Sequence, residues 1–168
     1  MSSSKSASLV IHGWTVFTHP LFLDQLEVLA QQVDAFKQKD PIGYVKKNAN
    51  KRLAAIIKLA FDIIPQDPTR SEYRQGGTLG NDHKYWFRAK FLQQYRLFFR
   101  YHVSSKMIVL AWVNDENTKR AYESSDDAYR VFRKMLDSGH PPDDWDQLLA
   151  EAQSEGHRLQ KLAATIKR

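Results

Sequence analysis

The segment from Trp86 to His102, WFRAKFLQQYRLFFRYH, combines cationic side chains with many aromatic and apolar residues and contains no carboxylate. Its potentially reactive side chains are Arg88, Lys90, Arg96, Arg100 and His102. Guanidinium and ammonium groups donate hydrogen bonds to phosphate oxygens, and a histidine can transfer protons near neutral pH. The segment is therefore the first candidate for phosphate chemistry.

Alternation along two strands places these cations on one face of a hairpin, because successive strand side chains point to opposite faces. A connection at positions 92–94 keeps the apolar sets of both strands on the same side and sets Lys90 opposite Arg96. Arg88 then faces Phe98. Like charges directly across a ladder destabilise a sheet by about a few tenths of a kcal/mol. We therefore expect an anionic group to neutralise this face.

Two sources of negative charge are open. Carboxylates of the same chain, such as Asp115, Glu116 or Asp126, would form an internal salt-bridge cluster. An external polyanion would neutralise the face from outside. The aromatic neighbours Trp86 and Phe98 favour RNA, because bases stack on aromatic rings while cations hold phosphates.

Positive charge is concentrated in two parts of the 168-residue chain, whose net charge is +6. Residues 70–102 hold seven Lys or Arg against two acids, and residues 46–58 hold five cations and no acid. A solvated surface explains a high isoelectric point by itself, but such clustering favours a polyanionic partner.

The chain has no Cys, which excludes disulfides, thiolate metal sites and Cys nucleophiles and fits a reducing cytoplasm. None of its six His has the helical spacing of a zinc site, so we expect neither a metal nor another cofactor. No apolar run approaches the ~18 residues of a membrane span. The first eight residues, MSSSKSAS, lack the apolar region of a signal peptide and are expected to be a disordered leader.

Hydrophobic periodicity predicts the elements that position the cationic face. These are a strand at 9–18, antiparallel helices at 21–39 and 43–64, strands at 85–92, 95–102 and 107–113, and helices at 125–136 and from 143 toward 168, broken at Gly156. The apolar strand MIVLAWV is expected at the centre of the sheet. The long irregular stretch at 65–82 is of a kind that is often functional, but it contains no P-loop.

The order of these elements resembles the RelE/ParE toxin superfamily. Four segments carry a closer resemblance: HGWTVFTHPLF, YRLFFRYH, VLAWVNDENTKRAY and DAYRVFRKMLDSGHPPDDW. Together they look like the YhaV family, the toxin half of a type II toxin–antitoxin pair whose antitoxin is PrlF. The resemblance spans residues 10–149.

This resemblance implies an α+β, RelE-like fold. An N-terminal strand and an antiparallel helical hairpin pack on a mostly antiparallel four-stranded sheet, followed by C-terminal helices. The toxin domain is expected at residues 9–150, after the disordered leader at 1–8 and before a helical or partly disordered tail at 151–168.

The resemblance also implies an endoribonuclease that cleaves mRNA on translating ribosomes and so arrests growth. In RelE-like enzymes, without a metal or cofactor, the ribose 2′-hydroxyl attacks the adjacent phosphorus and leaves a 2′,3′-cyclic phosphate and a 5′-hydroxyl. The protein must help remove the 2′-hydroxyl proton, stabilise the phosphorane and protonate the leaving oxygen. The implied partners are mRNA, the ribosome, a dimeric DNA-binding PrlF-like antitoxin, and operator DNA through the antitoxin complex. The implied location is the cytoplasm, without membrane contact.

On this resemblance Arg88, in FRAKF, is the first catalytic candidate. Lys90, Arg96 and Arg100 follow as groups that neutralise the phosphate. Three cationic neighbours favour the neutral amine of Lys90, which makes it a candidate general base as well. His102 is a candidate acid or base, although an exposed His at a strand end explains it equally well.

Seven further residues are candidate RNA contacts: Trp86, Phe98, Lys84, Arg74, His83, Tyr122 and His140. His140 stands in GHPPDDW, where a helix stop explains it without a binding role. Tyr122 and Tyr129 either stack on a base or, for Tyr129 beside Phe132, belong to the core or its rim.

Two other functions are compatible with this fold. A ParE-like toxin binds gyrase without catalysis, but that function does not call for a cluster of phosphate ligands. A nucleic-acid-binding corepressor, acting with its antitoxin at the operator, accounts for the basic face and can be a second role of the same protein. RNA cleavage that depends on Arg88 separates the enzyme from both.

Overall fold

The computed structural model describes residues 9–119 and 127–166, and the leader expected at 1–8 lies outside them. The strands are Val10–Ile11 (β1), Trp14–Thr18 (β2), Phe87–Phe91 (β3), Tyr95–His102 (β4) and Met107–Val113 (β5). The helices are Pro20–Lys39 (α2), Asn48–Lys58 (α3), Ile64–Gln66 (α4), Ala128–Asp137 (α5), Trp145–Gln153 (α6) and Gly156–Ile166 (α7). Short 3₁₀ turns lie at Gly43–Lys46, Ser71–Tyr73 and Asn81–His83, and a π-helical turn at Leu59–Ile63.

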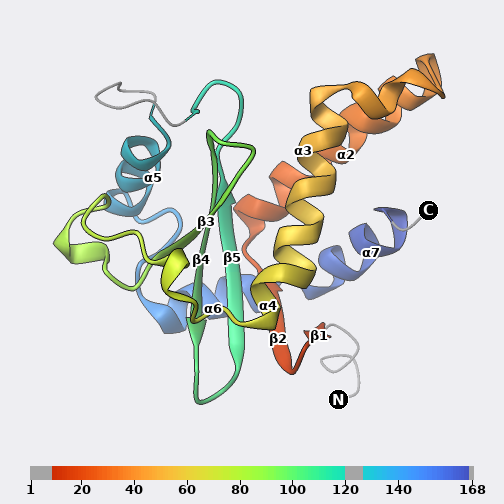
Figure 1. Ribbon diagram of the computed structural model, residues 1–168. Coiled ribbons are helices and arrows are strands. Elements are labelled where there is room, and N and C mark those ends of the chain that lie inside the picture. The colour runs from red at the N-terminus through yellow and green to blue at the C-terminus, as the bar shows by residue number, and fades with distance from the viewer. Residues whose placement is uncertain (1–8, 120–126, 167–168) are drawn as a thin grey trace.

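The fold is a single sheet with helices on both faces, which confirms the predicted α+β class. Leu97 and Phe99 of β4 point into a core that also contains residues of α2, α3 and α7. Phe98, between them, points into a second core with α5 and α6. Figure 1 shows the same division, with α2, α3 and α7 on one side of the sheet and α5 on the other.

The sheet has five strands in the order β1-β2-β5-β4-β3, one more than predicted. The single strand expected at 9–18 is wrong, because the backbone turns at His12 and Gly13, whose φ angles are +51° and +84°. The segment becomes an antiparallel hairpin of β1 and β2. Strand β2 then pairs in parallel with β5, so the sheet is mixed but mostly antiparallel.

The helix expected at 43–64 is a succession of shorter pieces. A 3₁₀ turn precedes α3, and a π-helical turn separates α3 from α4. Pro65 lies in the first turn of α4 and has no N–H to donate, so a regular helix cannot pass through it unchanged. The amide of Ile64 donates to the carbonyl of Leu59, five residues earlier, which is the hydrogen bond of a π turn.

The predicted hairpin register is confirmed. Lys90 pairs with Arg96, and Arg88 pairs with Phe98. The connection at 92–94 has positive φ angles at Leu92 (+45°) and Gln93 (+68°). The two like-charged side chains therefore stand directly opposite each other at the edge of the sheet, as alternation along the strands required.

Helix α7 packs against the main core at the C-terminal end of the chain. Its Leu159 and Leu162 are buried there, 3% and 8% exposed. Arg158 donates to the carboxylates of Asp24 (2.6 Å) and Glu27 (2.7 Å) on α2. Hydrogen bonds to these carboxylates, that of Glu27 above all, raise the pKa of Arg158. The interrupted apolar pattern at 151–168 thus ends in a helix that contacts α2.

Tyr73 provides a test of this core. Its side chain is 3% exposed, its ring meets Phe99 edge-on at 5.4 Å, and its hydroxyl has no hydrogen bond in the described part of the chain. Burial raises the pKa of this hydroxyl, partly offset by the charge of Arg70. The raised value means that the folded chain holds the proton to a higher pH than the unfolded chain, in which tyrosine titrates near ~10.

We predict that Tyr73→Phe leaves the free energy of unfolding at pH 7 unchanged or raises it by up to about 1 kcal/mol. Below pH ~10 the hydroxyl is protonated in both states, and above it the unfolded chain ionises first, so the stability of the wild type falls as the pH rises toward the folded pKa. The wild type should therefore lose more stability than the variant between pH ~9 and ~11. Urea denaturation across this range measures both effects, and a clear loss at pH 7 in the variant would contradict the prediction.

Candidate functional site

Two arginines of the hairpin meet at one hydroxyl group. The Nε atoms of Arg88 and Arg96 donate to the Tyr129 hydroxyl oxygen over 2.8 Å and 3.2 Å. Arg88 also donates to the Glu72 carbonyl at 2.7 Å. We call Arg88 and Arg96 the arginine pair. It places two positive charges next to a phenol oxygen at one end of the sheet.

The elements around the arginine pair explain its geometry. Arg88 and Arg96 lie on neighbouring strands β3 and β4, on the face that α5 covers. The Asp127 carboxylate caps α5 by accepting from the Tyr129 amide at 3.1 Å. Phe132, one turn later, stacks on Phe98 with ring centres 4.3 Å apart. The cap and this stacking together direct Tyr129 toward the two guanidinium groups.

Arg96, Arg88 and Lys90 differ in their exposure to solvent. Arg96 is 7% exposed, and its Nη1 donates to the carbonyls of Gln93 and Tyr95 at 2.8 and 2.9 Å. Arg88 is half-buried, and Lys90 is exposed. An incoming anion therefore meets Lys90 and Arg88 directly, whereas Arg96 adds charge from beneath.

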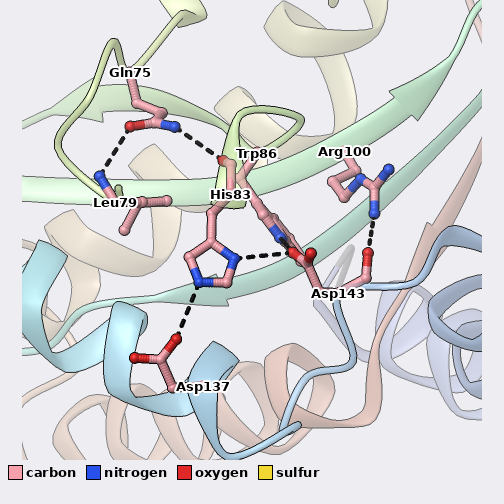
Figure 2. A network of polar contacts seen from close by, with 7 residues as sticks. All are labelled: Gln75, Leu79, His83, Trp86, Arg100, Asp137 and Asp143. Carbon is pink, nitrogen blue, oxygen red and sulfur yellow. Dashed lines mark hydrogen bonds and ion pairs between the residues drawn. The ribbon is translucent and has the colours of Figure 1, made fainter. Parts of the chain in front are cut away.

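A second cationic cluster lies farther along β4. The guanidinium carbon of Arg100 lies 5.7 Å, 5.8 Å and 5.6 Å from the ring centres of Tyr85, Trp86 and Trp145. Its Nη1 donates to the carbonyl of Asp143 (Figure 2). Burial lowers the pKa of Arg100, and the nearby carboxylates oppose this shift.

His102, at the end of β4, stacks on Trp145 with ring centres 5.7 Å apart. Its Nδ1 lies 2.7 Å from the Ser105 hydroxyl. Because a strand rises about 3.4 Å per residue, His102 lies about 20 Å along β4 from Arg96. The five catalytic candidates are therefore divided between two clusters, and His102 is too far away to act on a phosphate held by the arginine pair.

A histidine held between carboxylates connects the loop before β3 to the end of α5 (Figure 2). His83 Nε2 lies 3.1 Å from an Asp137 oxygen, and its Nδ1 lies 3.2 Å from Asp143 Oδ1. The same Asp143 oxygen accepts from the indole N–H of Trp86 at 2.7 Å. Gln75 holds the loop by donating to the His83 carbonyl at 3.0 Å. His83 is 7% exposed, so its position is structural and not the RNA contact predicted from the sequence.

The prediction that Trp86 and Phe98 stack on bases is wrong for this conformation, because both side chains are 0% exposed. Alternation correctly put them on the cationic face, but α5 and the loop at 75–83 cover the middle of that face. Trp86 meets Phe132 edge-on at 5.1 Å. The face is thus a second hydrophobic core with cations at its margins.

Two of the three internal carboxylates considered above, Asp115 and Glu116, have partners other than these cations. Asp115 accepts from the Asn117 amide within its own turn, and Glu116 accepts from Asn48 on α3. Asp126 lies outside the described residues. Over residues 9–119 and 127–166, neither member of the arginine pair forms an ion pair with a carboxylate.

The remaining candidates are dispersed. Arg74 and Lys84 line a hollow of about 340 Å³ on the other side of β3, together with Phe87 and Tyr101. His140 is exposed and follows the end of α5, far from the arginine pair in the sequence. Tyr122 lies outside the described residues.

The sequence predicted no place in the site for Tyr85, Trp145, Asp137 or Asp143, and for Tyr129 it left open a base contact or a place in the core or its rim. The segment GHPPDDW contains Asp143 and Trp145, but it predicted only a candidate RNA contact at His140 and a helix cap at Asp143 and Asp144. Their contacts to β3 and β4 depend on how α5 and α6 return to the sheet, which local patterns do not specify.

In the described ranges, no three His, Asp or Glu side chains gather as metal ligands. Within those same ranges, no helix is both long enough and apolar enough to cross a membrane. The guanidinium groups of the arginine pair and the exposed Lys90 beside them can donate hydrogen bonds to an anionic group.

An α+β fold that gathers cations at one end of its sheet is compatible with a nucleic-acid-cleaving toxin. Residues 16–153 match the YhaV toxin family, described as a toxin with endonuclease activity, of a toxin–antitoxin system. This match covers most of the chain, so the chain belongs to the YhaV family of toxins. The family predicted from the sequence motifs and the endonuclease class of the toxin are confirmed, and membership implies an antitoxin partner.

Curated relatives agree with this assignment. "Toxin YhaV" of Escherichia coli O6:H1 is 44% identical over 149 residues, which cover 88% of this chain and 96% of the relative. "Ribonuclease toxin YhaV" of Escherichia coli K12 is 43% identical over 145 residues, which cover 85% of this chain and 94% of the relative. No solved structure matches the chain, so the wider RelE/ParE relationship stays a prediction.

We predict that Asp143→Ala lowers the free energy of unfolding by about 1–3 kcal/mol, because the buried indole N–H of Trp86 loses its acceptor. Asp143→Asn keeps an acceptor oxygen and should cost less. Asp146→Ala, an exposed substitution in the first turn of α6, is the control. Urea denaturation of the three variants measures the order, and equal stabilities for Asp143→Ala and the control would refute the role of this contact.

Proposed function

We propose that the chain is an endoribonuclease toxin that cleaves mRNA through the arginine pair and Lys90. The observation that supports this most directly is the convergence of Arg88 and Arg96 on the Tyr129 hydroxyl beside an exposed lysine. The family description as an endonuclease and the name of the K12 relative as a ribonuclease support the same reaction.

The proposed reaction is an attack of the ribose 2′-oxygen on the adjacent phosphorus. The 2′-hydroxyl loses its proton, the new P–O bond closes a 2′,3′-cyclic phosphate, and the bond to the 5′-oxygen breaks. The leaving oxygen then takes up a proton. Negative charge grows on the phosphorane, so fixed cations that bind it more strongly than the ground state accelerate the step.

Each cation has a distinct proposed role. Arg88 and Lys90 contact the scissile phosphate because they are the accessible members of the cluster. Arg96 adds electrostatic stabilisation from its buried position and holds Tyr129. Lys90, flanked by cations, is the proposed general base. The Tyr129 hydroxyl is buried and accepts from both guanidinium groups, so its proposed role is to position the two arginines.

The wider setting follows from the family resemblance and stays part of the proposal. We infer that cleavage takes place on translating ribosomes in the cytoplasm and arrests growth. A dimeric, DNA-binding, PrlF-like antitoxin neutralises the toxin and brings the complex to operator DNA. The exposed cations support this proposal, because an antitoxin that inhibits cleavage must cover or displace them.

We predict that the purified chain cuts mRNA to fragments with 5′-hydroxyl and 2′,3′-cyclic phosphate ends, with or without EDTA. Arg88→Ala should lower the single-turnover rate by about 10²–10³-fold, as expected for loss of one donor to the developing charge. Lys58→Ala, an exposed cation on α3 across the sheet, is the matched control. Comparing reactions with and without translating ribosomes shows whether cleavage requires the ribosome. Mapping the ends of the RNA fragments identifies the cleavage chemistry.

Fragments with 5′-phosphate ends would exclude 2′-hydroxyl attack. Full activity of Arg88→Ala would exclude the arginine pair as the catalytic centre. Intact RNA in every lane, from a folded protein that still arrests growth, would favour a non-catalytic toxin or a corepressor.

The antitoxin has its own test. We predict that raising the salt concentration weakens the toxin–antitoxin complex if the antitoxin contacts Arg88, Lys90 and Arg100 directly. Added salt shortens the distance over which exposed charges attract each other, to about 10 Å at 0.1 M and to less at higher concentrations. Titration calorimetry at 50 and 500 mM salt measures the change. An affinity independent of salt would place the antitoxin on an apolar surface instead.

A further inference from the structure

A continuous series of π contacts runs across the far end of the cationic face. It begins at Tyr85, passes through the guanidinium of Arg100 at 5.7 Å, continues to Trp145 at 5.6 Å, and ends at His102 at 5.7 Å. We call these four residues the stacking ladder. They come from three separate parts of the chain, so only the folded structure brings them together.

The middle of the ladder packs on buried residues, and its two ends are exposed to solvent. Arg100 rests on the buried Trp86, 5.8 Å away, and donates to the Asp143 carbonyl (Figure 2). Its Nε is buried and has no hydrogen-bond partner among the described residues. At one end, Tyr85 is 72% exposed, and at the other end His102 is exposed. The ladder therefore has an exposed aromatic side chain at each end.

The ladder holds the cation Arg100 between flat aromatic rings. The carboxylates of Asp143 and Asp144 lie near enough to offset part of this charge, although each also accepts a hydrogen bond from another partner. Asp143 accepts from the Trp86 indole, and Asp144 caps α6 through the Gln147 amide at 3.0 Å.

Single-stranded RNA has the matching chemistry. Unpaired bases stack on aromatic side chains and on guanidinium planes, and cations hold the intervening phosphates. The ladder also lies on the same face of β4 as the arginine pair. Arg100 is four residues from Arg96, about 13 Å along the strand. One extended RNA strand is long enough to contact both.

We propose that the stacking ladder is a second RNA-binding subsite, in which Tyr85 and His102 stack on unpaired bases of the same strand, on one side of the scissile phosphate and several nucleotides from it. This inference rests on the proposed function and deepens it, because it makes single-stranded RNA the substrate and assigns Tyr85 and Trp145 to its recognition. The ladder binds and positions the strand, and the arginine pair acts on the phosphate.

The test uses a 2′-O-methyl oligoribonucleotide that carries 2-aminopurine, a base whose fluorescence falls when it stacks. The probe lacks the attacking 2′-hydroxyl, so binding is measured without cleavage. The wild type is expected to bind it and quench its fluorescence. Tyr85→Leu should weaken binding by about 5- to 100-fold and reduce the quenching, whereas Tyr85→Phe, which keeps the ring, should behave like the wild type.

Tyr44→Leu is the matched control, because Tyr44 also lies over a cation, Lys37 at 5.8 Å, but on the helical hairpin. It should leave probe binding unchanged. Thermal unfolding of all variants verifies that each is folded, as expected for a side chain as exposed as Tyr85.

Equal binding and quenching by the wild type and Tyr85→Leu would overturn the subsite, as would a wild type that does not bind the probe. A Tyr85→Leu variant that loses antitoxin affinity but keeps RNA affinity would also overturn it and assign the ladder to the antitoxin. Cleavage of natural mRNA is scored separately. Failure of the proposed function appears as absent cleavage, whereas failure of the subsite leaves cleavage intact and independent of Tyr85.

Discussion

The stacking of Phe98 on Phe132 holds α5 against the sheet, and both cationic clusters depend on it. The two rings lie 4.3 Å apart, and Trp112 stacks on Phe132 from β5 at 5.4 Å. With α5 fixed at this point, Tyr129 at its start reaches the arginine pair, and Asp137 at its end reaches the histidine of the loop before β3. Aromatic packing in the second core thus determines where the polar groups lie.

The arginine pair holds its positive charge without a carboxylate partner among the described residues. Phenol and carbonyl oxygens accept hydrogen bonds from Arg88 and Arg96, which satisfies many of their donors without neutralising their charge. A carboxylate partner would compete with a phosphate for the same groups. The neighbouring Lys90 adds a third charge at the edge of the sheet. The local field therefore favours an external anion and, most of all, one whose charge increases during reaction.

Buried aromatic residues in its middle divide the cationic face into two parts. Trp86 and Phe98 are buried in its middle, and the charged groups emerge on either side of them. This division explains why five candidate catalytic residues on two short strands do not form one site. An elongated substrate can contact both margins, whereas a small anion can contact only one. The arrangement is consistent with a nucleic acid strand as the ligand of this family's endonuclease fold.

Local sequence patterns determined much of this protein: the α+β class, the position of α2, the three strands of the hairpin region, and the pairing of Lys90 with Arg96. These features follow from periodicity and alternation, which act over a few residues. The hairpin at His12 and Gly13 was missed, because apolar residues continue through the turn and only the backbone angles reverse the chain.

Tertiary structure alone decided which parts of the cationic face of β3 and β4 remain exposed to solvent. Alternation put Trp86, Phe98 and the cations on one face, but it contains no information on where helices 30 or more residues later will pack. The return of α5 and α6 buried the aromatic residues, brought Tyr129 to the arginines, and placed Trp145 between Arg100 and His102 in the series of contacts. The residues that make up the candidate site could thus be predicted from the sequence. Its accessible surface could not be predicted, because burial is set by contacts between segments far apart in the chain.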